Sequence, residues 1–466
     1  MFSTRWSLAV CLAALLLSAS CLPAAEEAPP PAAPAKPAAT KAAKKSAKGA
    51  ESPAAKPAAK SDDTSNKDAA IDDSDPAKAL AALFKQAQDI QATLQKMQEE
   101  FQQADEERQK ELDGQFRAMI GDLQKKIMPR MTKLAVPLYL EDAANKQAEQ
   151  VTLSHIQQLF MENNYNQVAA TGEKLLAAER KHPAILNFTA VAHFATHDFE
   201  KAGAVLKEAK AAKEAKTPGG DVYDQLAGRF EGPIEKYPAL WEAEQKTRAQ
   251  EAEKDDLPRV AIETTKGKFL VELFENEAPN TVANFISLVQ GKKYDSTVFH
   301  RVIPGFMAQG GDPNTLDKDP RNDGQGGPGY HIVCECYTKK ARNHFQGSLS
   351  MAHGKDRDTG GSQFYITHLP TPHLNRNAGN SSVHTVFGRV LDGLDVALAL
   401  RQGDKIKSAT VVRKRDHEYK PETIPVDSPP PLDPVTDEDE AEKDPPKAKP
   451  KKGKTGGTKP PPPPEE

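Results

Sequence analysis

The stretch FHRVIPGFMAQGGD at residues 299–312 decides how the C-terminal part of the chain is interpreted. It places Arg301 just before the apolar run Val-Ile-Pro-Gly-Phe-Met and ends in Gly-Gly-Asp. Three more short segments follow: SLSMAHG at 348–354, GSQFYIT at 361–367 and HTVFGRV at 384–390. Short apolar segments that glycine interrupts at close intervals are typical of a closed, mostly antiparallel barrel.

The residues just before this stretch extend the same pattern. RVAIETTKGKFLVELF, which begins at Arg259, predicts two short strands joined at Lys266-Gly267. The segment after it predicts a helix that opens at Pro279 and ends at Gly291, with one apolar face. A second helix is expected at 394–400. We therefore expect a barrel capped by two helices.

Taken together, these segments resemble the cyclophilin-type peptidyl-prolyl cis-trans isomerases over residues 258–413. The resemblance implies an eight-stranded antiparallel barrel with two helices, and an enzyme that rotates X-Pro peptide bonds in proline-containing polypeptides. That rotation must cross a barrier of ~18–20 kcal/mol that amide resonance creates. Since no bond is broken, we expect no nucleophile, no metal and no cofactor.

The resemblance also assigns roles to individual residues. Arg301 is the expected donor, which favours a lone pair localised on the imide nitrogen, and Gln309 and His384 complete the predicted catalytic set. The predicted substrate-binding residues form the proline pocket and its polar rim: Phe306, Met307, Ala352, His353, Gln363, Tyr365, His373 and Leu374.

The chain departs from the family pattern at four places. Tyr365 stands where phenylalanine is frequent and adds a hydroxyl to the pocket wall. His353 replaces an asparagine, and His373 replaces a tryptophan found in many members, which puts cyclosporin-type inhibitor binding in doubt more than catalysis. The connection 375–383 is longer than usual and could alter access to the pocket.

Other chemical motifs in this region are weak. The loop GQGGPG at 324–329 resembles a phosphate loop only by its glycine content. Cys334 and Cys336 have no second pair at zinc-ligand spacing, so a metal site is not expected there. A bond between cysteines so close in sequence would be strained. We expect free thiols or an unusual redox pair.

The middle of the chain, residues 76–242, is predicted to be helical. Asp75 before Pro76 is a helix start signal, because a carboxylate caps the helix and proline fits its first position. Apolar or small residues then recur four and three residues apart, the spacing of a heptad seam: Leu83, Ala87, Ile90, Leu94, Met97, Phe101 and Ala104.

This seam loses its register at Arg108 and resumes near Leu112. One long helix, or two joined helices, should therefore run from about 76 to 127, where Pro129 ends or kinks it. Because three heptads are a short run, two interpretations stay open. The seam packs against neighbouring helices of the same chain, or it forms a dimeric coiled coil.

A weak internal repeat follows the seam. Tyr165 and Val168 recur as Phe199 and Ala202, a separation of 34 residues, which is the period of tetratricopeptide helix pairs. A short tetratricopeptide-like array and a generic helical hairpin bundle are both compatible with this pattern. By analogy of fold, such a region would bind a protein partner. Residues 243–257 are charged without an apolar face and predict a solvated linker helix.

Both ends of the chain have compositions that are not expected to form a packed hydrophobic core. Residues 1–21 have the layout of a cleaved secretory signal peptide, with an uncleaved N-terminal anchor as the alternative. A lipid anchor at Cys21 is a further alternative, because a lipoprotein-like box precedes that cysteine. Residues 22–75, rich in Ala, Pro and Lys, and 414–466, rich in Pro, Lys and Glu, predict disordered segments.

Composition narrows the function classes. A net charge of -4 argues against a broad nucleic-acid surface, and no apolar run beyond the N-terminus is long enough to span a membrane. We therefore expect an exported, periplasmic or secreted isomerase that assists protein folding. A lipid-anchored envelope protein is the alternative location. Two other functions remain: a proline-segment-binding chaperone or scaffold with little turnover, and a structural envelope component.

Overall fold

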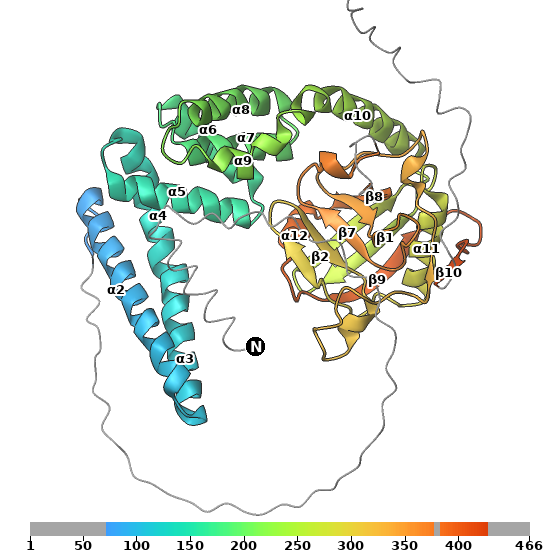
Figure 1. The fold of residues 1–466 in the computed structure, drawn as a ribbon, viewed down its shortest axis with the longest axis horizontal. Coiled ribbons are helices and arrows are strands. Elements are labelled where there is room, and N and C mark those ends of the chain that lie inside the picture. The colour runs from blue at the N-terminus through green and yellow to red at the C-terminus, as the bar shows by residue number, and fades with distance from the viewer. Residues whose placement is uncertain (1–70, 377–382, 427–466) are drawn as a thin grey trace, which may run out of the picture. The chain divides into compact units, whose positions relative to one another are not determined.

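The computed structural model describes residues 71–376 and 383–426 (Figure 1). The predicted signal peptide, nearly all of the N-terminal spacer and most of the predicted tail lie outside these residues. Helices occupy the described chain from Pro76 to Lys254, and strands begin at Arg259. Among the described residues, no helix has both the length and the apolar character needed to cross a membrane.

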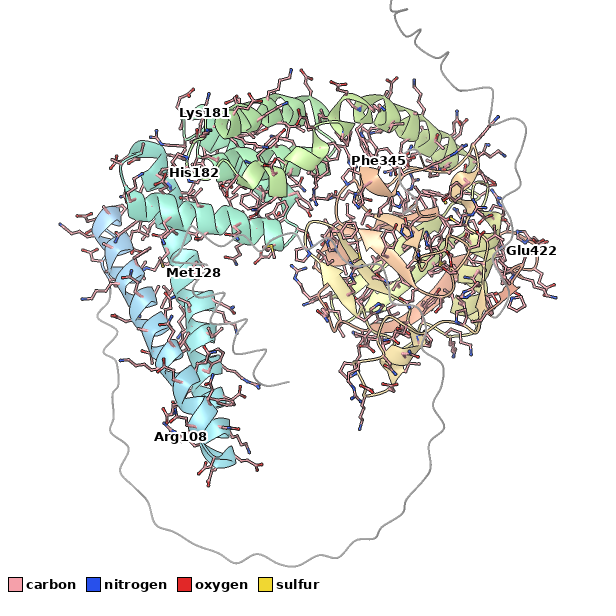
Figure 2. All side chains as sticks on the ribbon, viewed as in Figure 1. Arg108, Met128, Lys181, His182, Phe345 and Glu422 are labelled. Carbon is pink, nitrogen blue, oxygen red and sulfur yellow. The ribbon has the colours of Figure 1, made fainter. Side chains whose placement is uncertain are left out.

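The predicted helix start at Asp75 is confirmed. Helix α2 (Pro76–Gln103) begins there, and the Asp75 side chain accepts a hydrogen bond from the Lys78 backbone N–H at 3.1 Å. Asp105 caps the next helix, α3 (Glu106–Asp122), in the same way. Arg108, labelled in Figure 2, pairs across this turn with Glu100 at 2.8 Å. Of the two expectations, one long helix or two joined helices, the structure has the second, with the break a few residues before Arg108.

Of the two expectations for Pro129, that it ends or kinks the helix, the first is wrong. A π-helical turn, η1 (Leu123–Ile127), runs directly into α4 (Met128–Glu141), and Pro129 stands in the first turn of α4. The helix is continuous on both sides of Pro129, so the proline removes one backbone donor from its interior, and the wider π-helical turn lies where that hydrogen bond is missing. The helical winding changes just before the proline, and the chain continues as a helix beyond it.

The heptad seam of α2 is covered by helices of the same chain. Helix α2 lies against α3 and α4 (Figure 1). Leu83, Ala87, Leu94 and Met97 are buried there and share one apolar core with residues of α4. This arrangement is the first of the two interpretations that the sequence left open.

Two consecutive helix pairs follow, and they repeat one local geometry. The helices are α5 (Lys146–Met161), α6 (Tyr165–Ala177), α7 (Pro183–Ala195) and α8 (Phe199–Glu214). Tyr165 and Phe199, the two aromatic residues of the sequence repeat, open α6 and α8 and are buried. The turns before them contain Asn163 and His197, both left-handed at φ 59° and 65°. The tetratricopeptide assignment itself stays a prediction.

The linker helix is solvated over most of its residues, as expected, but one face of it is buried. Helix α10 (Tyr237–Lys254) forms as predicted, but the side chains of Glu244 and Glu251 are only 6% and 7% exposed. Arg342 of the barrel pairs with both carboxylates, and Arg389 lies 3.6 Å from Glu251. Two carboxylates of α10 are thus buried as ion pairs, and a search for an apolar face cannot detect them. Three short elements precede α10: α9 (Val222–Gln225), η2 (Gly228–Phe230) and η3 (Pro233–Glu235).

The C-terminal region is a curled antiparallel sheet of eight strands in the order β3-β4-β7-β6-β8-β2-β1-β9. An isolated antiparallel bridge between Val298 and Lys405 joins the two ends of this order. The predicted first hairpin is confirmed, with Thr264 opposite Gly267. The strands are β1 (Arg259–Thr264), β2 (Gly267–Leu273), β3 (Arg301–Ile303), β4 (Met307–Gly310), β6 (Ser348–Met351), β7 (Phe364–Thr367), β8 (Val386–Asp392) and β9 (Ile406–Arg413).

The two predicted helices of this region are present. Helix α11 (Pro279–Gln290) ends at Gly291 and buries the predicted apolar face, whereas α12 (Leu394–Leu398) is shorter than expected. Single turns of 3-10 helix complete the region: η4 (Pro313–Leu316), η5 (Glu335–Tyr337) and η6 (Pro372–Leu374).

The isomerase region continues beyond the predicted boundary at residue 413. Strand β10 (Ile424–Pro425) pairs with β5 (Tyr330–His331), and Tyr419 is buried with its hydroxyl donating to Glu275. The prediction of a disordered tail is therefore wrong for residues 414–426. One aromatic anchor in a polar stretch produces no periodic signal, which explains the error.

Candidate active site

Strands β3 and β4 bring Arg301 and Gln309 together. The two residues are directly paired in the antiparallel register, and Arg301 Nη1 donates to Gln309 Oε1 at 3.2 Å. The Arg301 side chain is half-buried, and this burial lowers the pKa of its guanidinium. An arginine nevertheless keeps its charge in proteins. The pair therefore presents an oriented cation at the surface of the sheet.

A chain of amide groups holds this pair in place. Gln309 Nε2 donates to Gln363 Oε1 at 2.9 Å, and Gln363 Nε2 donates to the carbonyl oxygens of Gly324 and Gly326 at 2.9 Å each. The glycine-rich loop 324–329 thus holds the side-chain amide of Gln363 in place. In both side-chain amides, the oxygen accepts a hydrogen bond and the nitrogen donates one. These bonds hold Gln309 in place and so limit the rotation of the Arg301 side chain.

The strand register places the polar and apolar site residues on one face. Arg301 pairs with Gln309, Gln309 pairs with Tyr365, and Tyr365 pairs with Ser350. Directly paired residues on neighbouring strands point to the same side of a sheet. Met307 is two residues from Gln309 and therefore shares this side.

An apolar cluster adjoins the arginine. Met307, Tyr365 and Leu374 are buried at 2%, 3% and 6% exposure, and Ile303, Phe306 and Ala352 pack against them. The structure thus brings together the apolar residues that the resemblance had selected, and Ile303 joins them. The cluster is a nonpolar surface next to a charged donor.

The hydroxyl of Tyr365 has a partner outside this cluster. It lies 3.0 Å from His344 Nε2, and His344 Nδ1 lies 2.9 Å from Asn375 Oδ1. Burial lowers the pKa of His344 to about 4, so that its imidazole is neutral near pH 7. The extra hydroxyl expected on the pocket wall is therefore satisfied by a buried histidine. His344 and Asn375 have no place in the matched motifs, and sequence reasoning missed their contribution.

His384 and His353 form a stacked pair beside Tyr365. Their ring centroids are 4.0 Å apart, and His384 meets Tyr365 edge-to-face at 5.5 Å. His384 Nδ1 lies 3.1 Å from the Met351 carbonyl, and His353 Nε2 lies 2.7 Å from the Val383 carbonyl. Burial lowers the pKa of His384 well below its usual range, which keeps this ring neutral. His353, which replaces an asparagine, thus supports the predicted pocket histidine.

His373 lies at the rim. Its ring centroid is 5.5 Å from that of Phe306, and the two rings are tilted by 36°. The backbone N–H of His384 donates to the Leu374 carbonyl at 3.2 Å, which closes the base of the long connection 375–383. Residues 377–382 of that connection lie outside the described residues.

Cys334 and Cys336 are both free thiols. Cys334 Sγ lies 3.3 Å from Thr385 Oγ1, next to His384 in the chain. In the described part of the chain, no group of three or more His, Cys, Asp or Glu side chains is arranged to hold a metal ion.

Comparison with known proteins matches this region to one family. The family described as cyclophilin type peptidyl-prolyl cis-trans isomerase/CLD matches residues 259–419. A peptidyl-prolyl cis-trans isomerase of Synechococcus elongatus is 48% identical over 158 residues, which are 34% of this chain and 97% of that protein. Peptidyl-prolyl cis-trans isomerase B of Bacillus subtilis is 48% identical over 144 residues, 31% of this chain and 90% of that protein.

A solved structure belongs to the same group. The crystal structure of a Cryptosporidium parvum cyclophilin type isomerase in the presence of the dipeptide Ala-Pro aligns at 30% identity with a TM-score of 0.28, covering 33% of this chain and 98% of that one.

The chain belongs to the cyclophilin-type peptidyl-prolyl cis-trans isomerases. It is an enzyme that interconverts cis and trans X-Pro bonds, and its substrates contain proline.

Proposed function

We propose that Arg301 drives the isomerisation by donating a hydrogen bond that stabilises the twisted X-Pro amide. As the amide twists, resonance is lost and the lone pair localises on the imide nitrogen, where a cationic donor lowers its energy. One well-aimed donor in a preorganised site contributes roughly 2.7–4 kcal/mol, or two to three decades of rate. The observation that carries this proposal is the hydrogen-bonded chain from Arg301 through Gln309 to Gln363 beside the apolar cluster.

The apolar cluster supplies the second component. Phe306, Met307, Tyr365 and Leu374 offer a nonpolar surface on which a pyrrolidine ring can pack, with His373 at its rim. When the bound ring excludes water, the local dielectric constant falls, and the electrostatic interaction between the amide and the neighbouring guanidinium becomes stronger. No covalent intermediate is needed, because the reaction only changes a dihedral angle.

The remaining polar residues bind and orient the substrate backbone. Gln363 accepts a hydrogen bond from Gln309, and its backbone carbonyl accepts one from the Ala352 N–H. His353, next to Ala352, stacks on His384, so these residues lie between Arg301 and the stacked histidines. His384, neutral because its pKa is lowered, contributes a flat uncharged wall to the pocket. We assign these four residues to binding and pocket shape, and the rotation itself to Arg301.

In the cell, the enzyme assists the folding of exported proteins, with proline-containing chains as clients. The signal-like N-terminus and the long Ala/Pro/Lys spacer support a periplasmic or secreted location, with a lipid anchor at Cys21 as the alternative. The helical region would recruit clients or a protein partner. Cell fractionation of the wild type and Cys21→Ala tests the location. Recovery of the wild type in the soluble periplasm contradicts anchoring, and recovery in the cytoplasm contradicts export.

An isomerisation assay on a proline tetrapeptide tests the catalytic assignment. We expect wild-type turnover, and for Arg301→Ala a loss of roughly two to three decades in kcat/KM with peptide binding retained. Arg321→Ala is a matched control, since that arginine is exposed and pairs only with Asp319. If the wild-type protein binds the peptide without turnover, the catalytic assignment is wrong and the protein is a proline-binding scaffold.

A further inference from the structure

The loop that carries Phe306 and Met307 is held from outside the barrel. Gly305, directly before Phe306, is buried and left-handed, with φ at 70°. Its backbone N–H donates to Asn163 Oδ1 at 2.9 Å, and its carbonyl accepts from Arg229 Nη2 at 3.2 Å. Both of these partners belong to the helical region. Both polar backbone groups of Gly305 are therefore bound by side chains that the isomerase domain does not contain.

Asn163 is placed to act as the principal link. It lies in the left-handed turn between α5 and α6, and only 2% of it is exposed. Its Oδ1 accepts from Gly305 N–H and from the Tyr165 hydroxyl, and its Nδ2 donates to the Leu398 carbonyl at the end of α12, each at 2.9 Å. One buried amide group thus joins the helical turn to two separate segments of the barrel.

Packing around Gly305 leaves the loop little freedom. The ring of Phe160, at the end of α5, lies 3.1 Å from the position that a Cβ on Gly305 would take. On the other side of the loop, the Phe306 carbonyl accepts from the His368 backbone N–H at 2.9 Å. The backbone of Phe306 is therefore fixed between the helical region and the strand that carries Tyr365.

The equivalent turn of the next helix pair also meets the barrel. His197, 34 residues after Asn163, stacks on Trp241 with ring centroids 3.8 Å apart and lies 5.8 Å from Phe345, the barrel residue labelled in Figure 2. A second polar link is near: Asn375, the partner of His344, donates to the Tyr237 hydroxyl of α10 at 2.9 Å. The helical region therefore reaches the pocket by two routes, through Gly305 and through Asn375.

We propose that Asn163 is a positioning residue for the isomerisation. By holding Gly305 in its left-handed conformation, Asn163 orients Phe306 and Met307 against the prolyl ring. A buried N–H group that loses its only partner is strongly disfavoured, so without the amide the loop shifts to find another acceptor. The helical region then completes the catalytic unit, beyond any role in recruiting partners. This inference rests on the assignment of Phe306 and Met307 to the proline pocket.

The test uses the full chain and three variants. Asn163→Gly removes the amide while glycine still tolerates the left-handed turn. We expect its kcat/KM on a proline tetrapeptide to fall about tenfold, and the Gly305 amide hydrogen to exchange faster. Asn163→Asp keeps the acceptor for Gly305 N–H but sets a carboxylate oxygen against the Leu398 carbonyl, so its kcat/KM should lie between those of Asn163→Gly and the wild type. Asn164→Ala removes a cap of α6 that does not contact the barrel, and should lower stability without changing kcat/KM.

Three results would overturn this assignment. They are an unchanged kcat/KM in Asn163→Gly, an equal loss of kcat/KM in Asn164→Ala, and an Asn163→Asp variant as slow as Asn163→Gly. The first two would give Asn163 a purely structural role in the helical turn. A wild type without turnover would instead contradict the proposed catalytic function, so the two failures are distinguishable.

Discussion

The barrel and the helical region bury polar side chains for different purposes. In the barrel, Arg301, Gln309 and Gln363 bond to one another and to nearby backbone, and they leave the guanidinium beside an apolar surface. In the helical region, Asn163 and Glu244 direct their polar atoms out of the helices and bond to the barrel. We propose that the first set serves the isomerisation, whereas the second joins two parts of the chain.

Removing Arg342, which pairs with both buried carboxylates of α10, should have the largest effect on stability. Arg342→Ala leaves Glu244 and Glu251 without their shared cation, so we expect the free energy of unfolding to fall by about 3–5 kcal/mol. Urea unfolding measures this change. Arg321→Ala, which breaks an exposed pair, should cost no more than about 1 kcal/mol. Equal losses in the two variants would mean that α10 is not anchored by these charges.

A smaller effect should appear on acidification. The pKa of His344 is lowered to about 4 in the folded protein, against 6.5 for an ordinary histidine. The unfolded chain therefore binds more protons below pH 6.5, and the stabilisation present above that pH is lost as the pH falls. Between pH 7 and 5, this histidine alone should lower the free energy of unfolding by about 2 kcal/mol.

His344→Gln isolates this contribution, because glutamine keeps a polar side chain without a titrating group. The change in the free energy of unfolding between pH 7 and pH 5 should then be smaller in the variant than in the wild type, by about the same 2 kcal/mol. His368 and His197, whose pKa values burial lowers to about 3, continue to contribute in both proteins. An unaltered pH dependence in the variant would contradict the buried, neutral state of His344.

The smallest expected effect is that of removing the Tyr365 hydroxyl, which tests whether this group takes part in the reaction or only stabilises the fold. Since the Tyr365 hydroxyl bonds to His344 and not to the pocket, Tyr365→Phe should keep kcat/KM within about twofold and lose about 1 kcal/mol of stability. Peptide isomerisation and urea unfolding measure the two quantities. A large loss of kcat/KM with unchanged stability would place the hydroxyl in the reaction.

The barrel was predictable because four motifs in order match one family, and the same resemblance placed Arg301 and Gln309 in one catalytic set. The contacts that depend on distant partners were not. Glu244 is buried by an arginine nearly a hundred residues away, and Asn163 lies in a turn whose sequence gives no sign of Gly305. Pro129 does not end the helix because a π-helical turn directly before it keeps the chain helical, and no sequence pattern marks that turn.

We propose that Arg301 acts as the donor and that Gln309 works only by orienting it. A double-mutant cycle on kcat/KM tests this most directly, with Arg301→Ala, Gln309→Ala and both changes together. We expect Gln309→Ala to cost about tenfold in the wild-type background and nothing once Arg301 is absent. Losses that simply multiply would contradict the claim, since Gln309 would then act on the substrate independently of the guanidinium.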